Sequence, residues 1–116
     1  MIRKGKMRDI PAIQKLVNSY AEQGQMLSLS LVDLYDNLRD FFVNEENGEV
    51  IGAAALHLVW DGLAEVRSMA VRKDMQGRGI AKELVQRLLA EAREYDCKRV
   101  FTLTYVPGFF EKLGFV

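Results

Sequence analysis

The sequence predicts an α/β (α+β) domain with a mixed, mostly antiparallel sheet and a central βαβ crossover. Its central region, residues 39–72, consists of short apolar runs that Asn47-Gly48 and Asp61-Gly62, two hairpin turn signals, join into strands. Apolar residues recur at helical spacing on both sides of this region. The predicted order is β-α-α-β-β-β-α-β-α-β, with the final strand missing.

The N-terminal part predicts two helices. The first spans residues 9–22, where Asp9 can cap the helix and Pro11 suits its first turn. Its apolar positions at helical spacing are Ile10, Ile13, Leu16, Val17 and Tyr20. The second helix begins at Ser30, which can form a capping box with Asp33.

Strands and helices alternate along the rest of the chain. The antiparallel strands are expected over residues 39–45, 49–60 and 63–72. After them come a helix from Ile80 to Ala92, a strand over 98–105 and a short helix over 109–113 that Gly114 ends. The chain stops at Phe115-Val116, which has the character of a strand start, so we expect the final strand to be absent.

The composition indicates a single domain, residues 1–116, in the cytoplasm. Sixteen Lys and Arg balance 16 Asp and Glu, so the net charge is zero and nothing indicates binding to nucleic acid or to a membrane. Cys97 is the single cysteine, so no disulfide is expected, and no metal is expected either. Any recognition of an anion must therefore be local.

The segment from Gln76 to Lys82 predicts such an anion site. A helix start presents unpaired N–H groups and partial positive charge, and Gly77 and Gly79 would let a phosphate approach the main chain. Arg78 and Lys82 add positive charge, which opposes the helix dipole unless an anion neutralises it. The alternative is a tight strand-to-helix turn with solvated basic neighbours.

The sequence QGRGIA, residues 76–81, resembles the Q/R-x-x-G-x-G/A coenzyme A loop of the GNAT acetyltransferases. The resemblance extends from IRKGKMRDIPAI through GAAALHLVW and LAEVRSMAV to RVFTLTYVPGFFEKLGF, and so over the whole chain. Within the superfamily the chain is most similar to the short, stand-alone amino-acid N-acetyltransferases of the N-acetylglutamate synthase type, which act early in arginine synthesis. The resemblance implies the GNAT fold and acetyl-CoA as cosubstrate.

The resemblance also implies a donor site. Main-chain groups of Met69, Ala70 and Val71 would pair with pantetheine in a notch where their strand separates from the next. The pyrophosphate would bind the loop formed by Gln76, Gly77, Arg78, Gly79, Ile80 and Ala81. Pantetheine amides suit a free strand edge, and pyrophosphate suits a helix N-terminus.

For catalysis, Glu65 matches the general base of synthase-type relatives, acting through a water. Strict strand alternation places Glu65 and Arg67 on one face with Leu63, Met69 and Val71. An ion pair with Arg67 at the sheet surface is the structural alternative for Glu65.

Thr104 matches a hydroxyl residue that helps to hold the catalytic water in these relatives, and an ordinary strand residue is the alternative. Many relatives protonate the thiolate with a tyrosine of an F-Y pair, but here the pair is Phe109-Phe110. Tyr105 or solvent would have to supply that proton.

The acceptor site departs from the synthase pattern, because Leu29 stands where an arginine that binds carboxylate is expected. In addition to Leu29, the candidate acceptor-binding residues are His57 and Arg67. Arg3 is a further cation that could replace the missing arginine. The resemblance implies transfer of acetyl to a small amino acid, for which glutamate is one candidate. The alternatives are another amine, such as a polyamine or protein N-terminus, and a sensor that binds acyl-CoA without turnover. Related domains often dimerise, so a homodimer is considered by analogy.

Overall fold

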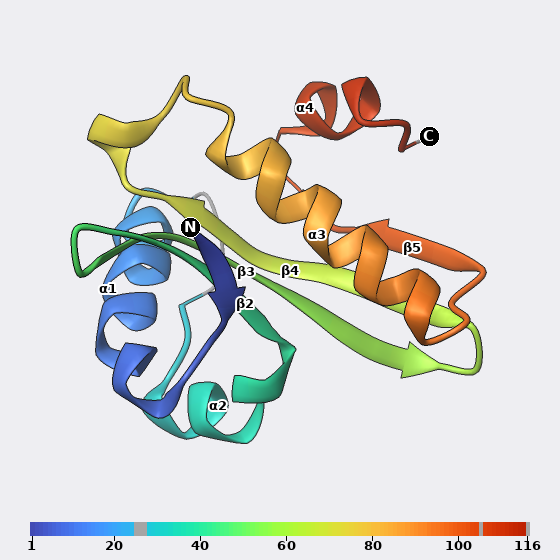
Figure 1. Ribbon diagram of the computed structural model, residues 1–116, viewed down its shortest axis with the longest axis horizontal. Coiled ribbons are helices and arrows are strands. Elements are labelled where there is room, and N and C mark those ends of the chain that lie inside the picture. The colour runs from blue at the N-terminus through green and yellow to red at the C-terminus, as the bar shows by residue number, and fades with distance from the viewer. Residues whose placement is uncertain (25–27, 105, 116) are drawn as a thin grey trace.

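The computed structural model describes residues 1–24, 28–104 and 106–115 and confirms the predicted fold class (Figure 1). Within these residues, five strands form one sheet in the order β1-β2-β3-β4-β5. They are β1 (Ile2–Lys4), β2 (Phe41–Glu46), β3 (Glu49–Trp60), β4 (Leu63–Val71) and β5 (Arg99–Thr102). Strands β1 to β4 pair antiparallel, and β5 pairs parallel with β4, which is the predicted crossover.

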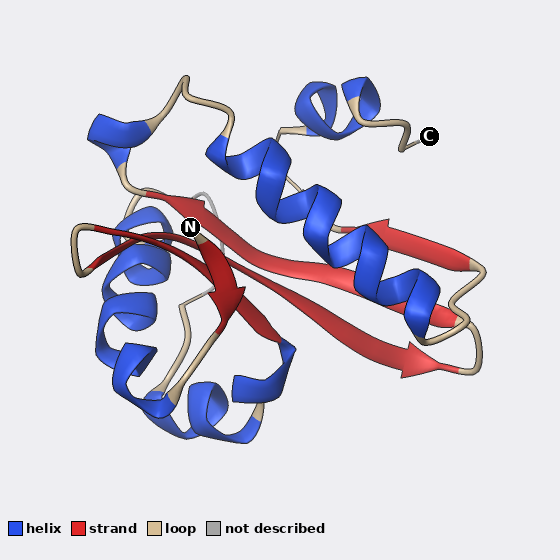
Figure 2. Cartoon of the chain, viewed as in Figure 1, coloured by secondary structure: helices blue, strands red, loops and turns tan. Residues whose placement is uncertain are grey.

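Helices cover both faces of the sheet (Figures 1 and 2). Helices α1 (Ile10–Ala21) and α2 (Leu31–Asp36) pack on one face, and α3 (Ile80–Glu94) and α4 (Pro107–Lys112) pack on the other. Single 3-10 turns occupy Met7–Asp9, Leu38–Asp40 and Lys73–Met75. No helix of the described residues is long and apolar enough to cross a bilayer.

The alternation of β2 supplies both apolar layers. Phe41 and Val43 pack in the cluster beneath α1, whereas Phe42 packs in the cluster beneath α3. Ile13 of α1 and Leu88 of α3 are 0% exposed. Full burial of such a side chain contributes about 1.5–3 kcal/mol, so the amphipathic helix faces hold the layers together.

Turn chemistry confirms the predicted meander. Asn47 and Gly48 have φ of 52° and 78°, which are the two positive angles that a type I′ hairpin turn requires. Gly62 has φ of 70° between β3 and β4. At the second helix, Ser30 accepts a hydrogen bond from the Asp33 amide, so the predicted capping box is present.

Some predicted details were wrong. Asp9 precedes α1, but its carboxylate accepts from the Lys6 amide at 2.7 Å and so caps the preceding 3-10 turn. The predicted strand at 39–45 begins at Phe41, because Leu38–Asp40 form a turn of 3-10 helix. Strand β5 ends at Thr102, three residues earlier than predicted, as the chain turns toward α4.

Candidate active site

Strands β4 and β5 separate before β4 ends. Their pairing ends at Val66 and Thr102, where the Thr102 Oγ1 hydroxyl donates to the Val66 carbonyl oxygen at 3.1 Å. Strand β4 continues to Val71, and in the described part of the chain no strand pairs with residues 67–71 on the side of β5. In that part of the chain this edge of β4 is therefore open, without a neighbouring strand.

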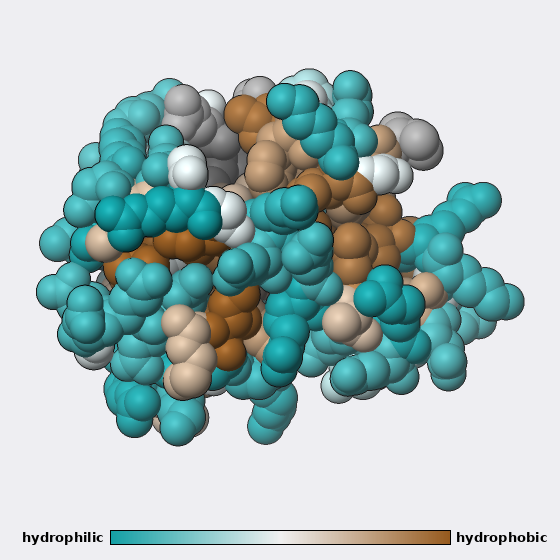
Figure 3. Space-filling view, turned by 45° about the horizontal axis from the view of Figure 1, so that its top comes forward, coloured by the Kyte–Doolittle hydropathy of each residue, from teal (hydrophilic) through white to brown (hydrophobic). Residues whose placement is uncertain are grey.

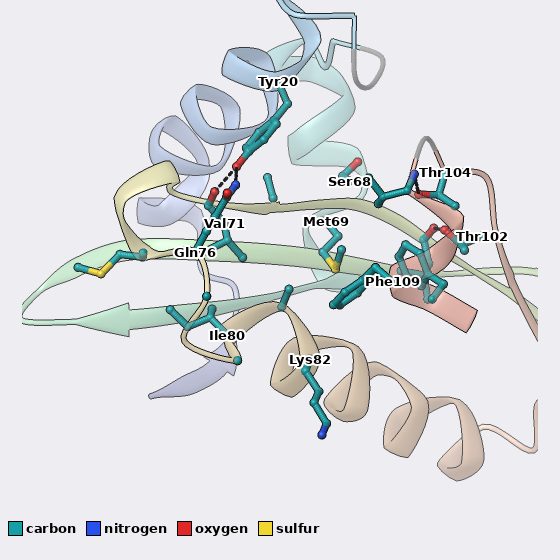
Figure 4. Close-up of a pocket in the computed structure, with 18 of the residues that line it drawn as sticks. Tyr20, Ser68, Met69, Val71, Gln76, Ile80, Lys82, Thr102, Thr104 and Phe109 are labelled. Carbon is teal, nitrogen blue, oxygen red and sulfur yellow. Dashed lines mark hydrogen bonds between the residues drawn. The ribbon is translucent and has the colours of Figure 1, made fainter. Parts of the chain in front are cut away.

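A cavity of about 630 Å³ lies beside this edge (Figure 4). Met69 and Phe109 line it and pack with the cluster on the α3 face. Ala70 and Tyr20 also line it but pack with the cluster on the α1 face. The cavity therefore extends between the separated strands from one face of the sheet toward the other.

A β-bulge at Ser68 shapes the free edge of β4. The pairs Ala55–Arg67 and Ala53–Ala70 leave one residue between them on β3 and two on β4. Ser68 has φ of 54°, which is uncommon for a residue other than glycine. Such bulges occur often beside active sites, because they redirect the side chains that follow.

The bulge corrects the prediction from strict alternation. Val66 packs on the α3 face and Ala70, four residues on, packs on the α1 face, so the alternation shifts by one between them. Met69 and Val71 consequently pack on the α3 face, whereas Glu65 faces the α1 side. Uninterrupted alternation predicts that these residues share one face of the sheet. The structure shows that they do not.

The glycine turn leads directly into α3. Gly77 and Gly79 have φ of 82° and 78°, and Gly79 is the N-cap of α3 without a side-chain cap. Apart from the adjoining residues of the chain, a Cβ atom at either glycine would meet no described atom within 4 Å. The left-handed backbone accounts for the glycines, and the open space beside them leaves the first-turn N–H groups of α3 accessible.

The basic residues near this turn differ in their pairing. Arg72 donates to Asp74 and to Glu49, and these hydrogen bonds raise the pKa of Arg72 and lower that of Asp74. Arg78 and Lys82 are exposed and form no ion pair with the described residues. They are therefore the cations available to an anion at the turn.

The predicted base lies in a polar cluster on the α1 face of the sheet. Glu65 is 8% exposed and accepts from Arg67 Nε at 2.6 Å. His57 is its direct cross-strand neighbour and lies 2.7 Å from Asp40 through Nδ1. The structure thus brings Glu65, His57 and Arg67 together, but none of them lines the 630 Å³ cavity.

The segment after β5 supplies Thr104 to the cavity wall. Its Oγ1 accepts from the Val106 amide at 2.9 Å, which leaves its O–H proton for another acceptor. Phe109 also lines the cavity and packs edge to face on Phe110, with ring centroids 5.1 Å apart. Tyr105, the candidate acid, lies outside the described residues.

Leu29 is held between α1 and α2. Its amide donates to Asn18 Oδ1 at 3.0 Å, and its side chain packs against the cluster on the α1 face. The Arg3 guanidinium is already paired, because it binds Asp9 through two nitrogens and Glu45 through Nε. We therefore do not place Arg3 in the acceptor site.

Sequence reasoning missed three residues of this region. The sequence predicts Tyr20 only as part of the apolar face of a helix, yet Tyr20 lines the cavity. Ser68 carries no glycine or asparagine signal for its bulge, and Asp40 gave no sign of its contact with His57. Only the folded structure brings these residues to their partners.

A second cavity of about 370 Å³ lies between α3, β5 and α4 and is lined largely by apolar side chains, including Leu89, Phe110 and Leu113. Figure 3 shows apolar side chains exposed in several places between the hydrophilic ones on this face of the molecule. In contrast to the larger cavity, it lies away from the glycine turn.

A crossover sheet whose parallel strands separate beside a glycine turn defines the class of the protein. The acetyltransferase (GNAT) family matches residues 10–115, so the chain belongs to this family and is an N-acetyltransferase. An amino-acid acetyltransferase of Mycobacterium tuberculosis is 41% identical to it over 118 residues, which cover 99% of this chain and 67% of that relative.

Two solved structures agree with this placement. Rv2747 from Mycobacterium tuberculosis, in complex with CoA and NLQ, matches with a TM-score of 0.96 at 40% sequence identity. The match covers 100% of this chain and 71% of the Rv2747 chain. N-acetylglutamate synthase from Neisseria gonorrhoeae, complexed with coenzyme A and N-acetyl-glutamate, matches with a TM-score of 0.94 at 28% identity. That match covers 97% of this chain and 27% of the longer synthase.

Proposed function

We propose that this chain transfers the acetyl group of acetyl-CoA to the amine of a small α-amino acid. One observation carries the proposal. Glu65 pairs with Phe101, one residue before the last β4–β5 pair, so the buried carboxylate lies where the strands begin to separate. A thioester at the apex of the cleft would therefore lie near a base on the α1 face. The relatives named as amino-acid acetyltransferases support the same chemistry.

The donor side follows from the free edge and the turn. Main-chain groups of Met69, Ala70 and Val71 would pair with the amides of pantetheine, as an extended peptide pairs with an open strand edge. The pyrophosphate would lie at the amides that begin α3, from Gly77 onward, with Arg78 supplying charge. The complexes of Rv2747 and the gonococcal synthase, both with coenzyme A, support this placement.

The reaction is a direct attack in a ternary complex. The amine nitrogen forms a bond to the thioester carbon, the C–S bond breaks, and the thiolate leaves with its electron pair. The amine proton passes through a water to Glu65, and the O–H of Thr104 donates to that water. A proton from solvent or Tyr105 neutralises the thiolate.

The acceptor side is formed on the α1 face. Arg67 uses Nε on Glu65, so its terminal nitrogens can meet a single carboxylate, and the side chain is 45% exposed. His57, fixed by Asp40, and Leu29 would complete this side. One guanidinium matches the one α-carboxylate that all amino acids share, so we favour an amino acid and leave its side chain open.

The test is release of free thiol from acetyl-CoA with a panel of amino acids, polyamines and short peptides. The proposal predicts turnover with one or more free amino acids and none with the methyl ester of the same amino acid, which lacks the carboxylate. Faster turnover with polyamines or peptide N-termini would contradict the acceptor class. Coenzyme A binding without turnover of any acceptor would contradict catalysis.

A further inference from the structure

Tyr20 stands at the cavity wall although it belongs to α1, on the other face of the sheet from α3. Its hydroxyl donates to the Val71 carbonyl oxygen at 2.5 Å and accepts from Gln76 Nε2 at 2.5 Å (Figure 4). Val71 ends the free edge of β4, and Gln76 begins the glycine turn. One hydroxyl therefore joins the two elements to which the donor is assigned.

The ring and the hydroxyl of Tyr20 have separate structural roles. The ring packs against the apolar cluster beneath α1, and Lys73 Nζ lies 5.7 Å from its centroid. Phenylalanine would keep this packing and this cation–π contact. The hydroxyl adds only the two hydrogen bonds, so it can be removed without emptying the core.

The turn itself has few other attachments. Among the described residues, the Gln76–Tyr20 contact is the one side-chain hydrogen bond to residues 76–79. Both glycines of the turn are exposed and have positive φ. A turn with so few contacts loses conformational freedom when it binds a ligand, and an existing tether reduces that cost.

We propose that Tyr20 is a positioning residue for the acetyl donor. Its hydroxyl fixes the Val71 carbonyl and the Gln76 amide, and so holds the strand edge and the glycine turn at the separation that the pantetheine and diphosphate parts of one donor require. The inference rests on the proposed function. Tyr20 acts through these two groups and not on the reacting atoms.

The experiment compares wild type, Tyr20→Phe, Gln76→Leu and the double variant, with coenzyme A as the probe in calorimetric titrations. Loss of one hydroxyl bridge should weaken coenzyme A binding about 3- to 10-fold. The KM for acetyl-CoA should rise by the same factor, and kcat should stay within about twofold. Tyr95→Phe, at an exposed tyrosine that follows α3, is the matched control and should bind as wild type does.

The double variant tests the route through Gln76. Because Gln76 acts through the Tyr20 hydroxyl, Tyr20→Phe with Gln76→Leu should bind coenzyme A no more weakly than Tyr20→Phe alone. Additive losses would overturn that route.

Two further outcomes separate this inference from the proposed function. Wild-type affinity in Tyr20→Phe, or a fall in kcat and thermal stability with unchanged affinity, would overturn the positioning role while leaving the donor site in place. Failure of the wild-type protein itself to bind coenzyme A would overturn the proposed function.

Discussion

At the scale of single residues, Glu65 is the charge whose position most needs explanation. It is one of three buried polar residues among those described, together with Asp9 and Asn44. Arg67 Nε donates a hydrogen bond to one of its carboxylate oxygens, Oε1, at 2.6 Å. A carboxylate that only paired with arginine could lie at the surface, whereas this one is buried at the point where two strands separate.

Glu65→Gln should lower kcat about 100-fold or more with little change in coenzyme A affinity. The amide keeps the size of the side chain and can still accept from Arg67, but it cannot take a proton. Steady-state kinetics and titration with coenzyme A measure the two effects. Glu46→Gln, at an exposed glutamate at the end of β2, is the control, and wild-type turnover in Glu65→Gln would exclude the general-base role.

The sequence predicts Glu65 and Thr104 because each occupies a recognisable position in a family pattern, and their roles stay predictions. It does not predict Tyr20, because the hydroxyl finds its partners 51 and 56 residues away. Helical spacing explains why the ring is partly buried, but it does not predict the hydrogen-bond partners of the hydroxyl. Contacts of this range depend on how α1 lies against β4.

At the scale of elements, the turn before α3 is the feature that sequence reasoning describes best. The predicted glycine turn is present, with positive φ at both glycines, and the parallel crossover follows. The β4 bulge is what alternation could not foresee, because Ser68 has no residue-type signal for positive φ. Because of the bulge, Met69 and Val71 pack on the face opposite Glu65, whereas strict alternation predicts that they share its face.

Gly79→Asp should weaken coenzyme A binding by about 100-fold or more. A carboxylate at the N-cap would occupy the open space beside the turn and repel a diphosphate. Gly48→Asp is the matched control, because Gly48 also has a φ of 78° and open surroundings but lies in the β2–β3 hairpin. Equal affinity in the two variants, with folding confirmed by circular dichroism, would contradict the turn as donor site.

The junction of β1 and α1 rests on an ion pair. Asp9 is 4% exposed and accepts from Arg3 at 2.7 and 3.0 Å, and these hydrogen bonds lower the pKa of Asp9 below its ordinary 3.8. A lowered native pKa contributes stability above the ordinary value that is lost as pH falls through the native value. The contribution of Asp9 should therefore begin to fall as the pH drops below about 3.8, and it should be lost only below the lowered native pKa.

Asp9→Asn should reduce the free energy of unfolding at pH 7 by about 2–3 kcal/mol, because it leaves Arg3 poorly compensated. Urea denaturation at pH 7 and at pH 3 measures the change, and the difference from wild type should shrink at the lower pH. Asp36→Asn, at an exposed position of α2, is the control. A difference that is constant across this range would contradict the assigned ion pair.

At the scale of the whole molecule, the two helical layers divide the site between them. The α3 layer provides the glycine turn, and the α1 layer covers the face that carries Glu65 and His57. The cavity between β4 and β5 connects the layers, and Tyr20 of α1 reaches into it. This division is compatible with the proposed transfer from a donor on one side to an acceptor on the other.

The central claim is that the β4 edge and the glycine turn together hold coenzyme A. A crystal structure of the protein with coenzyme A tests it most directly. We predict pantetheine along the main chain of Met69 to Val71 and the diphosphate at the amides from Gly77 to Lys82, with the Tyr20 hydroxyl still on Gln76. If coenzyme A bound elsewhere and contacted neither this edge nor these amides, the assignment of the donor site would be contradicted.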